Sequence, residues 1–157
     1  QSYGSSGSDS SGWSVQAQRF QMEATPIDGE FQVNTYTTES QLHPSIASDS
    51  RGNFVVAWDS NGSTGSDQFY ESVQARQFRA DGSPASSEFQ VNTYTTSSQR
   101  GPAVASNASG GFVVTWESSG SSSSDNSSTS IQAQRYDGLF SDGFESGGTI
   151  RWSLTAP

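Results

Sequence analysis

Hydrophobic and polar residues alternate along short stretches of this chain, and clusters of turn residues separate the stretches. Val73 and Ala75 are expected on one face of a strand, with Gln74, Arg76 and Phe78 on the other. Gly, Ser, Asp and Pro recur at short intervals, and no segment shows the period of about 3.6 residues that marks an amphipathic helix. The pattern predicts an all-β fold.

One stretch of the chain contains four predicted strands in succession. They are expected over residues 44–48, 53–59, 73–78 and 88–94. Turn residues 49–52 join the first two strands as a hairpin, and a polar loop over residues 60–71 leads to the third. Four antiparallel strands in a row are typical of one blade of a β-propeller; a β-sandwich or a β-solenoid is the alternative.

The pattern repeats along the chain with a constant offset. Phe-Gln-Val-Asn-Thr-Tyr-Thr-Thr at residues 31–38 returns unchanged at 89–96, an offset of 58 residues (31 to 89). Phe-Val-Val-Ala-Trp at 54–58 returns as Phe-Val-Val-Thr-Trp at 112–116 with the same offset. A fixed period of this length indicates stacked or radially arranged units, each too small to bury its own apolar face.

The phase of the repeat divides the chain into four parts within one structural domain. They are a half repeat of two strands (1–36), a full repeat (37–94), a truncated repeat (95–137) and a C-terminal tail with a candidate donor strand (138–157). Closed propellers use about 4 to 8 blades, so roughly two and a half units are not expected to close a ring alone.

These motifs resemble a known tandem repeat. Gln-Val-Asn-Thr, Pro-Ser-Ile-Ala, Phe-Val-Val-x-Trp and Val-Gln-Ala-x, followed by an Asp-Gly turn, are similar to a blade-like repeat of large secreted or surface proteins of bacteria. The tail sequence Asp-Gly-Phe-Glu-Ser-Gly at 142–147 resembles a C-terminal signature of secreted proteobacterial proteins. The resemblance implies propeller-like blades and a location outside the cell or on its surface.

Composition and charge narrow the function classes. Only 30% of the residues are hydrophobic, which predicts a thin core, and there is no cysteine for a disulfide framework. The formal net charge is −9 and all seven basic residues are Arg, which argues against nucleic acid as a partner. No stretch approaches the roughly 20 apolar residues of a membrane helix, so membrane insertion is not expected.

The predicted core follows the repeated apolar strands. It comprises Phe54, Val56, Trp58, Phe112, Val114 and Trp116. Trp13 is not dictated by the repeat, because its equivalent in the next unit is Glu71, and it is a candidate for an interface or for a ligand such as a sugar.

Repeated carboxylates in the polar loops suggest calcium. Asp9, Asp67 and Asp125 are equivalent and close turns rich in Gly and Ser, while Asp59 and Glu117 follow the repeated Trp residues. Calcium takes about 6 to 8 oxygen ligands, which such loops can supply from carboxylates and backbone carbonyls. The alternative is that each Asp bonds its own backbone in a solvated turn.

Catalysis is not predicted. The lone His43 is replaced by Gly101 in the next unit, so the repeat does not require an imidazole. The chain has no Gly-rich phosphate loop between strand and helix, and no His/Cys spacing typical of a metal site.

The half unit suggests a structural role. Its unpaired edge is expected to receive a strand from a second copy, either from the segment 149–155 or from the hairpin that ends at 112–116. The residues expected at this assembly interface are Ile150, Trp152, Leu154, Trp13 and Val15. We therefore predict a non-catalytic extracellular subunit of a fibre, matrix or surface layer. A secreted or cell-surface module for glycans or proteins, as a fragment of a larger propeller, is the alternative.

Overall fold

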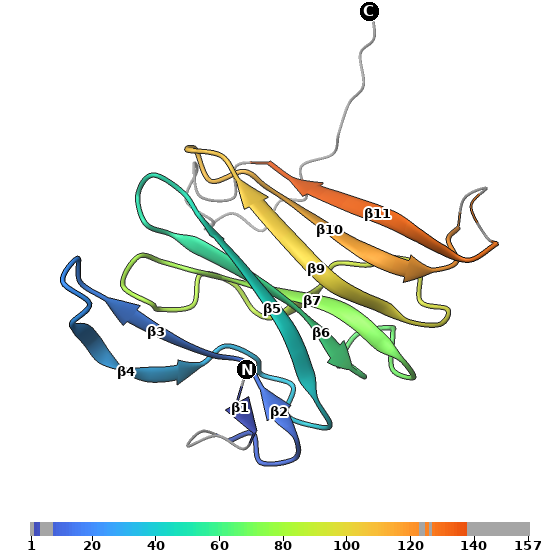
Figure 1. The fold of residues 1–157 in the computed structure, drawn as a ribbon, viewed down its shortest axis with the longest axis horizontal. Coiled ribbons are helices and arrows are strands. Elements are labelled where there is room, and N and C mark those ends of the chain that lie inside the picture. The colour runs from blue at the N-terminus through green and yellow to red at the C-terminus, as the bar shows by residue number, and fades with distance from the viewer. Residues whose placement is uncertain (1, 4–7, 123–124, 126, 138–157) are drawn as a thin grey trace, which may run out of the picture.

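The computed structural model describes residues 2–3, 8–122, 125 and 127–137, and these residues form strands and turns (Figure 1). The described part contains no helix that could cross a membrane. The strands are β1 (Ser2–Tyr3), β2 (Trp13–Ser14), β3 (Gln16–Phe20), β4 (Pro26–Gln32), β5 (Gln41–Ser48), β6 (Phe54–Asn61), β7 (Glu71–Phe78), β8 (Phe89–Gln90), β9 (Gln99–Ser106), β10 (Phe112–Ser119) and β11 (Thr129–Tyr136).

The strands form several small antiparallel sheets, none of which closes on itself. A four-stranded sheet has the order β5-β6-β7-β8, and a three-stranded sheet has the order β11-β10-β9. Two further pairs are β3-β4 and β1-β2. The prediction of an all-β fold is confirmed.

Strand boundaries follow the sequence repeat more closely than they follow the ranges predicted from composition. The middle sheet begins at Gln41, not at Pro44, and β9 begins 58 residues later, at Gln99. Strand β6 runs two residues beyond the predicted end, and β8 spans only Phe89–Gln90 of the predicted range 88–94. The short β8 has a physical cause in the side chain of Asn92, described below.

The sheets lie side by side in chain order, with the pair β3-β4 next to the middle sheet and β9 across β5 on its far side (Figure 1). Strand β6 is therefore buried on both faces. Its first face packs in one apolar cluster, which consists of Val15, Val33, Phe54, Val56, Trp58 and Phe78. Its second face packs in another, which consists of Val55, Ala57, Val73, Ala75, Val91, Phe112, Val114 and Trp116.

The same aromatic contact closes both clusters at one end. The rings of Phe54 and Phe78 stack with centroids 5.0 Å apart, and Phe112 and Tyr136 stack at 4.7 Å. Phe31 lies against Phe78 at 5.6 Å, as Phe89 lies against Tyr136 at 5.6 Å. Each ring buried in this way stabilises the fold by roughly 1.5–3 kcal/mol, so both contacts between sheets rest on equivalent residues.

A buried side-chain amide replaces the backbone pairing where β8 ends. Asn92 Oδ1 accepts the N–H of Val73 at 2.8 Å, and Asn92 Nδ2 donates to Asp67 Oδ2 at 2.8 Å and to Gln99 Oε1 at 3.2 Å. Asn34 makes the equivalent bonds to Val15, Asp9 and Gln41 at 2.9, 2.7 and 3.1 Å. These amides join a strand, a loop and the first strand of the following unit.

We expect Asn92→Ala to lower the free energy of unfolding by about 2–4 kcal/mol, because it leaves the buried Val73 N–H and the Asp67 carboxylate without a partner. Denaturant unfolding followed by intrinsic fluorescence measures the change. The matched control is Asn61→Ala at the exposed end of β6, which should stay within about 0.5 kcal/mol of the wild type. Equal effects of the two substitutions would contradict the structural role of Asn92.

Candidate assembly interface

Two strands at opposite ends of the stack have an open edge in the described chain. Strand β7 pairs with β6 on one side and with β8 on the other, whereas β11 pairs with β10 alone and β3 with β4 alone. The carbonyl of Val73 in β7 accepts the N–H of Val91, which shows that its backbone points toward β8. By equivalence, the backbone groups of Ile131 and Ala133 in β11 point toward the open side.

The outer face of the last sheet exposes positions that are buried in the middle sheet. Val73 is 0% exposed, and its equivalent Ile131 is 71% exposed. Val113, the equivalent of the buried Val55, is half-buried. An apolar face that the middle sheet buries against β9 and β10 is thus presented to solvent by β10 and β11.

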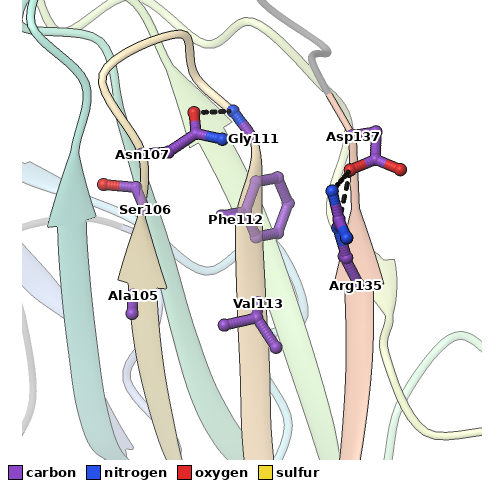
Figure 2. Close-up of a pocket in the computed structure, with 8 residues that line it drawn as sticks. All are labelled: Ala105, Ser106, Asn107, Gly111, Phe112, Val113, Arg135 and Asp137. Carbon is purple, nitrogen blue, oxygen red and sulfur yellow. Dashed lines mark hydrogen bonds and ion pairs between the residues drawn. The ribbon is translucent and has the colours of Figure 1, made fainter.

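A shallow pocket lies on this outer face, near the turn between β9 and β10 (Figure 2). Its volume is about 250 Å³, and Ala105, Val113 and Arg135 lie across three neighbouring strands on one face. Asn107 Oδ1 accepts the N–H of Gly111 at 2.9 Å and holds the turn, and Arg135 forms a surface ion pair with Asp137 at 2.7 Å.

The equivalent place on the middle sheet is occupied by β9. Ser45 Oγ accepts the N–H of Val104 at 3.0 Å, and the hydroxyl of Ser106 donates to the carbonyl of Ser48 at 2.6 Å. The hydroxyl of Ser50 donates to the carbonyl of Ala108 at 2.8 Å. The pocket of Figure 2 therefore corresponds to a surface that binds a β-strand elsewhere in the same molecule.

The other end of the stack exposes the complementary side chains. Phe20 is 55% exposed, although its equivalent Phe78 is 1% exposed. Ile46 in β5 is 61% exposed, although its equivalent Val104 packs against the second cluster. The two ends thus carry the two halves of the contact that holds the sheets together internally.

The structure separates the residues predicted for the interface. Trp13 is 38% exposed and lies edge-on to Tyr3, with ring centroids 5.3 Å apart. Val15 is 1% exposed and packs in the first cluster, so it is a core residue and not a surface one. Ile150, Trp152 and Leu154 lie outside the described residues.

The predicted core residues lie in the two apolar clusters. Phe54, Val56 and Trp58 belong to the first cluster, and Phe112, Val114 and Trp116 to the second. All six are less than 9% exposed.

The carboxylates predicted to bind calcium have different surroundings. Asp9 and Asp67 are buried, and each accepts a hydrogen bond from an Asn amide. Burial raises the pKa of Asp67, although the bond from Asn92 opposes the rise. Asp125 is exposed, and the position equivalent to its Asn partner is Ile150. No three His, Asp or Glu side chains of the described chain gather as metal ligands. The calcium site stays a prediction.

Asp59 and Glu117 also differ, although they are equivalent. Glu117 is exposed and lies opposite Arg100 in the sheet. Asp59 is 2% exposed, accepts the N–H of Gly101 at 3.1 Å and lies 2.9 Å from His43 Nδ1. It therefore connects the middle sheet to the bulge at the start of β9.

Sequence reasoning did not identify several of these contacts. His43 and Gly101 are equivalent, both have positive φ (50° and 63°), and both meet the same Asp59 carboxylate. The signal in the sequence was the recurrence of a bulge residue before Pro at both positions, which marks a special backbone but does not reveal the partner. No protein-family model matches the chain, and no curated protein matches it significantly.

We expect the stability of the protein to depend on the ionisation of Asp59. Burial raises the pKa of Asp59 above its ordinary 3.8, although Gly101 and His43 lower it in part and Glu71 adds to the rise. The folded state then holds the proton more tightly than the unfolded state. The resulting stabilisation is fully present below pH 3.8 and is lost as the pH rises through the raised pKa.

Asp59→Asn keeps the neutral form at every pH, so its stability relative to the wild type should increase as the pH rises above 3.8. Urea unfolding of both proteins from about pH 3 to 7 measures the difference. Glu117→Gln at the exposed equivalent position is the matched control, with little change expected. A constant difference between Asp59→Asn and the wild type across this range would refute the raised pKa.

Proposed function

We propose that this chain is a non-catalytic structural subunit that assembles with copies of itself by strand pairing, in an extracellular fibre, matrix or surface layer. The observation that carries the proposal is the pair of open edges, on β3 and β11, at opposite ends of the stack. Unpaired edge strands are sites of association unless they are protected. Each edge is here flanked by apolar side chains that are buried at the equivalent internal positions.

The geometry of such pairing is head-to-tail. The two edges differ in sequence and belong to opposite ends of the chain, so one copy offers β11 to a strand of the next copy, and so on. A heterologous contact of this kind gives a ring when the rotation closes and an open filament when it does not.

The blade-like organisation of the units is part of the same proposal. The order β5-β6-β7-β8 is a meander of four antiparallel strands, as a propeller blade requires, and the offset of 58 residues relates it to β9-β10-β11. The resemblance of the repeat to those of bacterial surface proteins favours an extracellular location. The net charge of −9 supports partners other than nucleic acid.

We expect Ala133→Pro to reduce self-association of the full chain at least tenfold. The substitution removes an N–H that points to the open side of β11, and it leaves the bonds between β10 and β11 in place. Sedimentation velocity over a range of protein concentrations measures the effect.

The control is Ala133→Thr, which retains the N–H and a residue suited to a strand, and should associate like the wild type. A wild-type chain that stays monomeric at every concentration would overturn the proposed function. Undiminished assembly of Ala133→Pro would exclude the edge of β11 from it.

A second candidate function is a surface module that binds glycans, which the exposed pair of Tyr3 and Trp13 favours. The two rings meet edge to face at 72°, and Ser40 Oγ accepts a long hydrogen bond of 3.5 Å from the N–H of Trp13. An exposed aromatic ring beside polar groups suits a sugar.

If this candidate holds, a panel of oligosaccharides should change the tryptophan fluorescence of the wild type saturably, and Trp13→Ala should abolish the change. Phe69→Ala is the control, because Phe69 is 87% exposed but belongs to another loop. No saturable response with any oligosaccharide of the panel would leave the structural role as the sole candidate.

A further inference from the structure

The segment Phe-Gln-Val-Asn-Thr-Tyr-Thr-Thr occurs twice with identical sequence, and its first occurrence binds a carboxylate. The N–H of Thr35, the hydroxyl of Thr35 and the N–H of Tyr36 all donate to Glu88 Oε2, at 2.5, 2.8 and 3.2 Å. Two successive backbone N–H groups and a hydroxyl that converge on one oxygen form an anion-binding nest. We call this group of three donors the Thr35 nest.

The Thr35 nest ties two sheets together. Glu88 directly precedes β8 of the middle sheet, whereas Thr35 follows β4 of the preceding pair. Arg76 adds a favourable charge near Glu88, and its Nη1 donates to the carbonyl of Val33 at 3.0 Å. The carboxylate is therefore held by hydrogen bonds that are strengthened by its charge.

The second occurrence of the segment repeats the local geometry. Asn92 Nδ2 donates to the carbonyl of Tyr94 at 3.0 Å, as Asn34 Nδ2 does to that of Tyr36 at 2.9 Å. The hydroxyl of Tyr94 lies 2.9 Å from the position of a Cβ on Gly120, as the hydroxyl of Tyr36 does from Gly62. The two segments thus lie in the same relation to the loops around them.

The second nest differs in its acceptor. The residue equivalent to Glu88 is Ser146, so the repeat supplies no carboxylate at that position. Within the described residues, the N–H and hydroxyl of Thr93 and the N–H of Tyr94 have no hydrogen-bond acceptor, and Thr93 is exposed. The donors that bind Glu88 are therefore duplicated without their ligand.

We infer that Thr93 and Tyr94 form a second carboxylate-binding site, which we call the Thr93 nest. It takes one carboxylate oxygen on two N–H groups and one hydroxyl, as the Thr35 nest does. The warrant is that the same eight residues bind a carboxylate in the other half of this molecule. The inference goes beyond the proposed assembly and does not depend on it.

The carboxylate can come from the chain or from another molecule. Glu145 lies outside the described residues, but it follows Thr93 by 52 positions, against 53 between Thr35 and Glu88. Glu30, the equivalent of Glu88 in the first unit, is exposed and is available to a second copy. A free carboxylic acid has the same chemistry.

The test uses acetate as the probe and the backbone amide protons as the readout. In ¹H–¹⁵N spectra of the full chain, added acetate should move the Thr93 and Tyr94 amide protons downfield and saturably. The Thr35 and Tyr36 amide protons should not respond, because Glu88 already occupies their nest. In Glu88→Ala the Thr35 nest should become responsive, which provides the matched positive control.

Glu145→Gln and Glu30→Gln identify the source if the Thr93 nest is already occupied. A response to acetate that appears only in Glu145→Gln assigns the carboxylate to the same chain. A response that appears only in Glu30→Gln, or on dilution, assigns it to a second copy. Silence of Thr93 and Tyr94 toward acetate in the wild type and in both variants overturns the inference, whatever Glu88→Ala shows.

Discussion

No sheet of this molecule can bury its apolar residues without a neighbouring sheet, and this constraint determines the rest of the structure. Strand β6 places Phe54, Val56 and Trp58 on one face and Val55 and Ala57 on the other, so both faces need cover. With only 30% hydrophobic residues in the chain, each contact between sheets depends on a few large side chains. Stacking in chain order satisfies the middle sheet, and it necessarily leaves one face of each end sheet without a neighbour.

Side-chain amides complete what the apolar clusters begin. Asn34 and Asn92 each take the place of a backbone strand at the edge of a sheet, and each also binds the first Gln of the following sheet. A buried amide with all of its bonds made is costly to disturb, because any shift leaves several polar groups without water or partner. These amides therefore fix the register between consecutive sheets, which dispersion contacts alone would specify poorly.

The all-β fold, the strand order within the middle sheet and the two faces of β6 could be predicted from the sequence. Alternation reports which side chains share a face, and the constant offset places equivalent strands in equivalent positions. The ends of β8 could not be predicted, because the side chain of Asn92 competes with backbone pairing and composition does not show which will win. The contacts of Glu88 with Thr35 and of His43 with Asp59 join residues whose pairing depends on how the sheets stack. Local pattern carries no information on that arrangement.

The same packing decides how a second copy can approach. The hairpin of β9 and β10 was one predicted donor for the open edge of β3, but β10 pairs with β9 on one side and along its whole length with β11 on the other. To donate this hairpin, a copy would have to break a complete antiparallel ladder and expose Phe112, Val114 and Trp116, which are nearly fully buried. Addition at the open edges of β3 and β11 requires neither loss. Association through these edges therefore preserves both apolar clusters, and the backbone groups that already face outward gain the new hydrogen bonds.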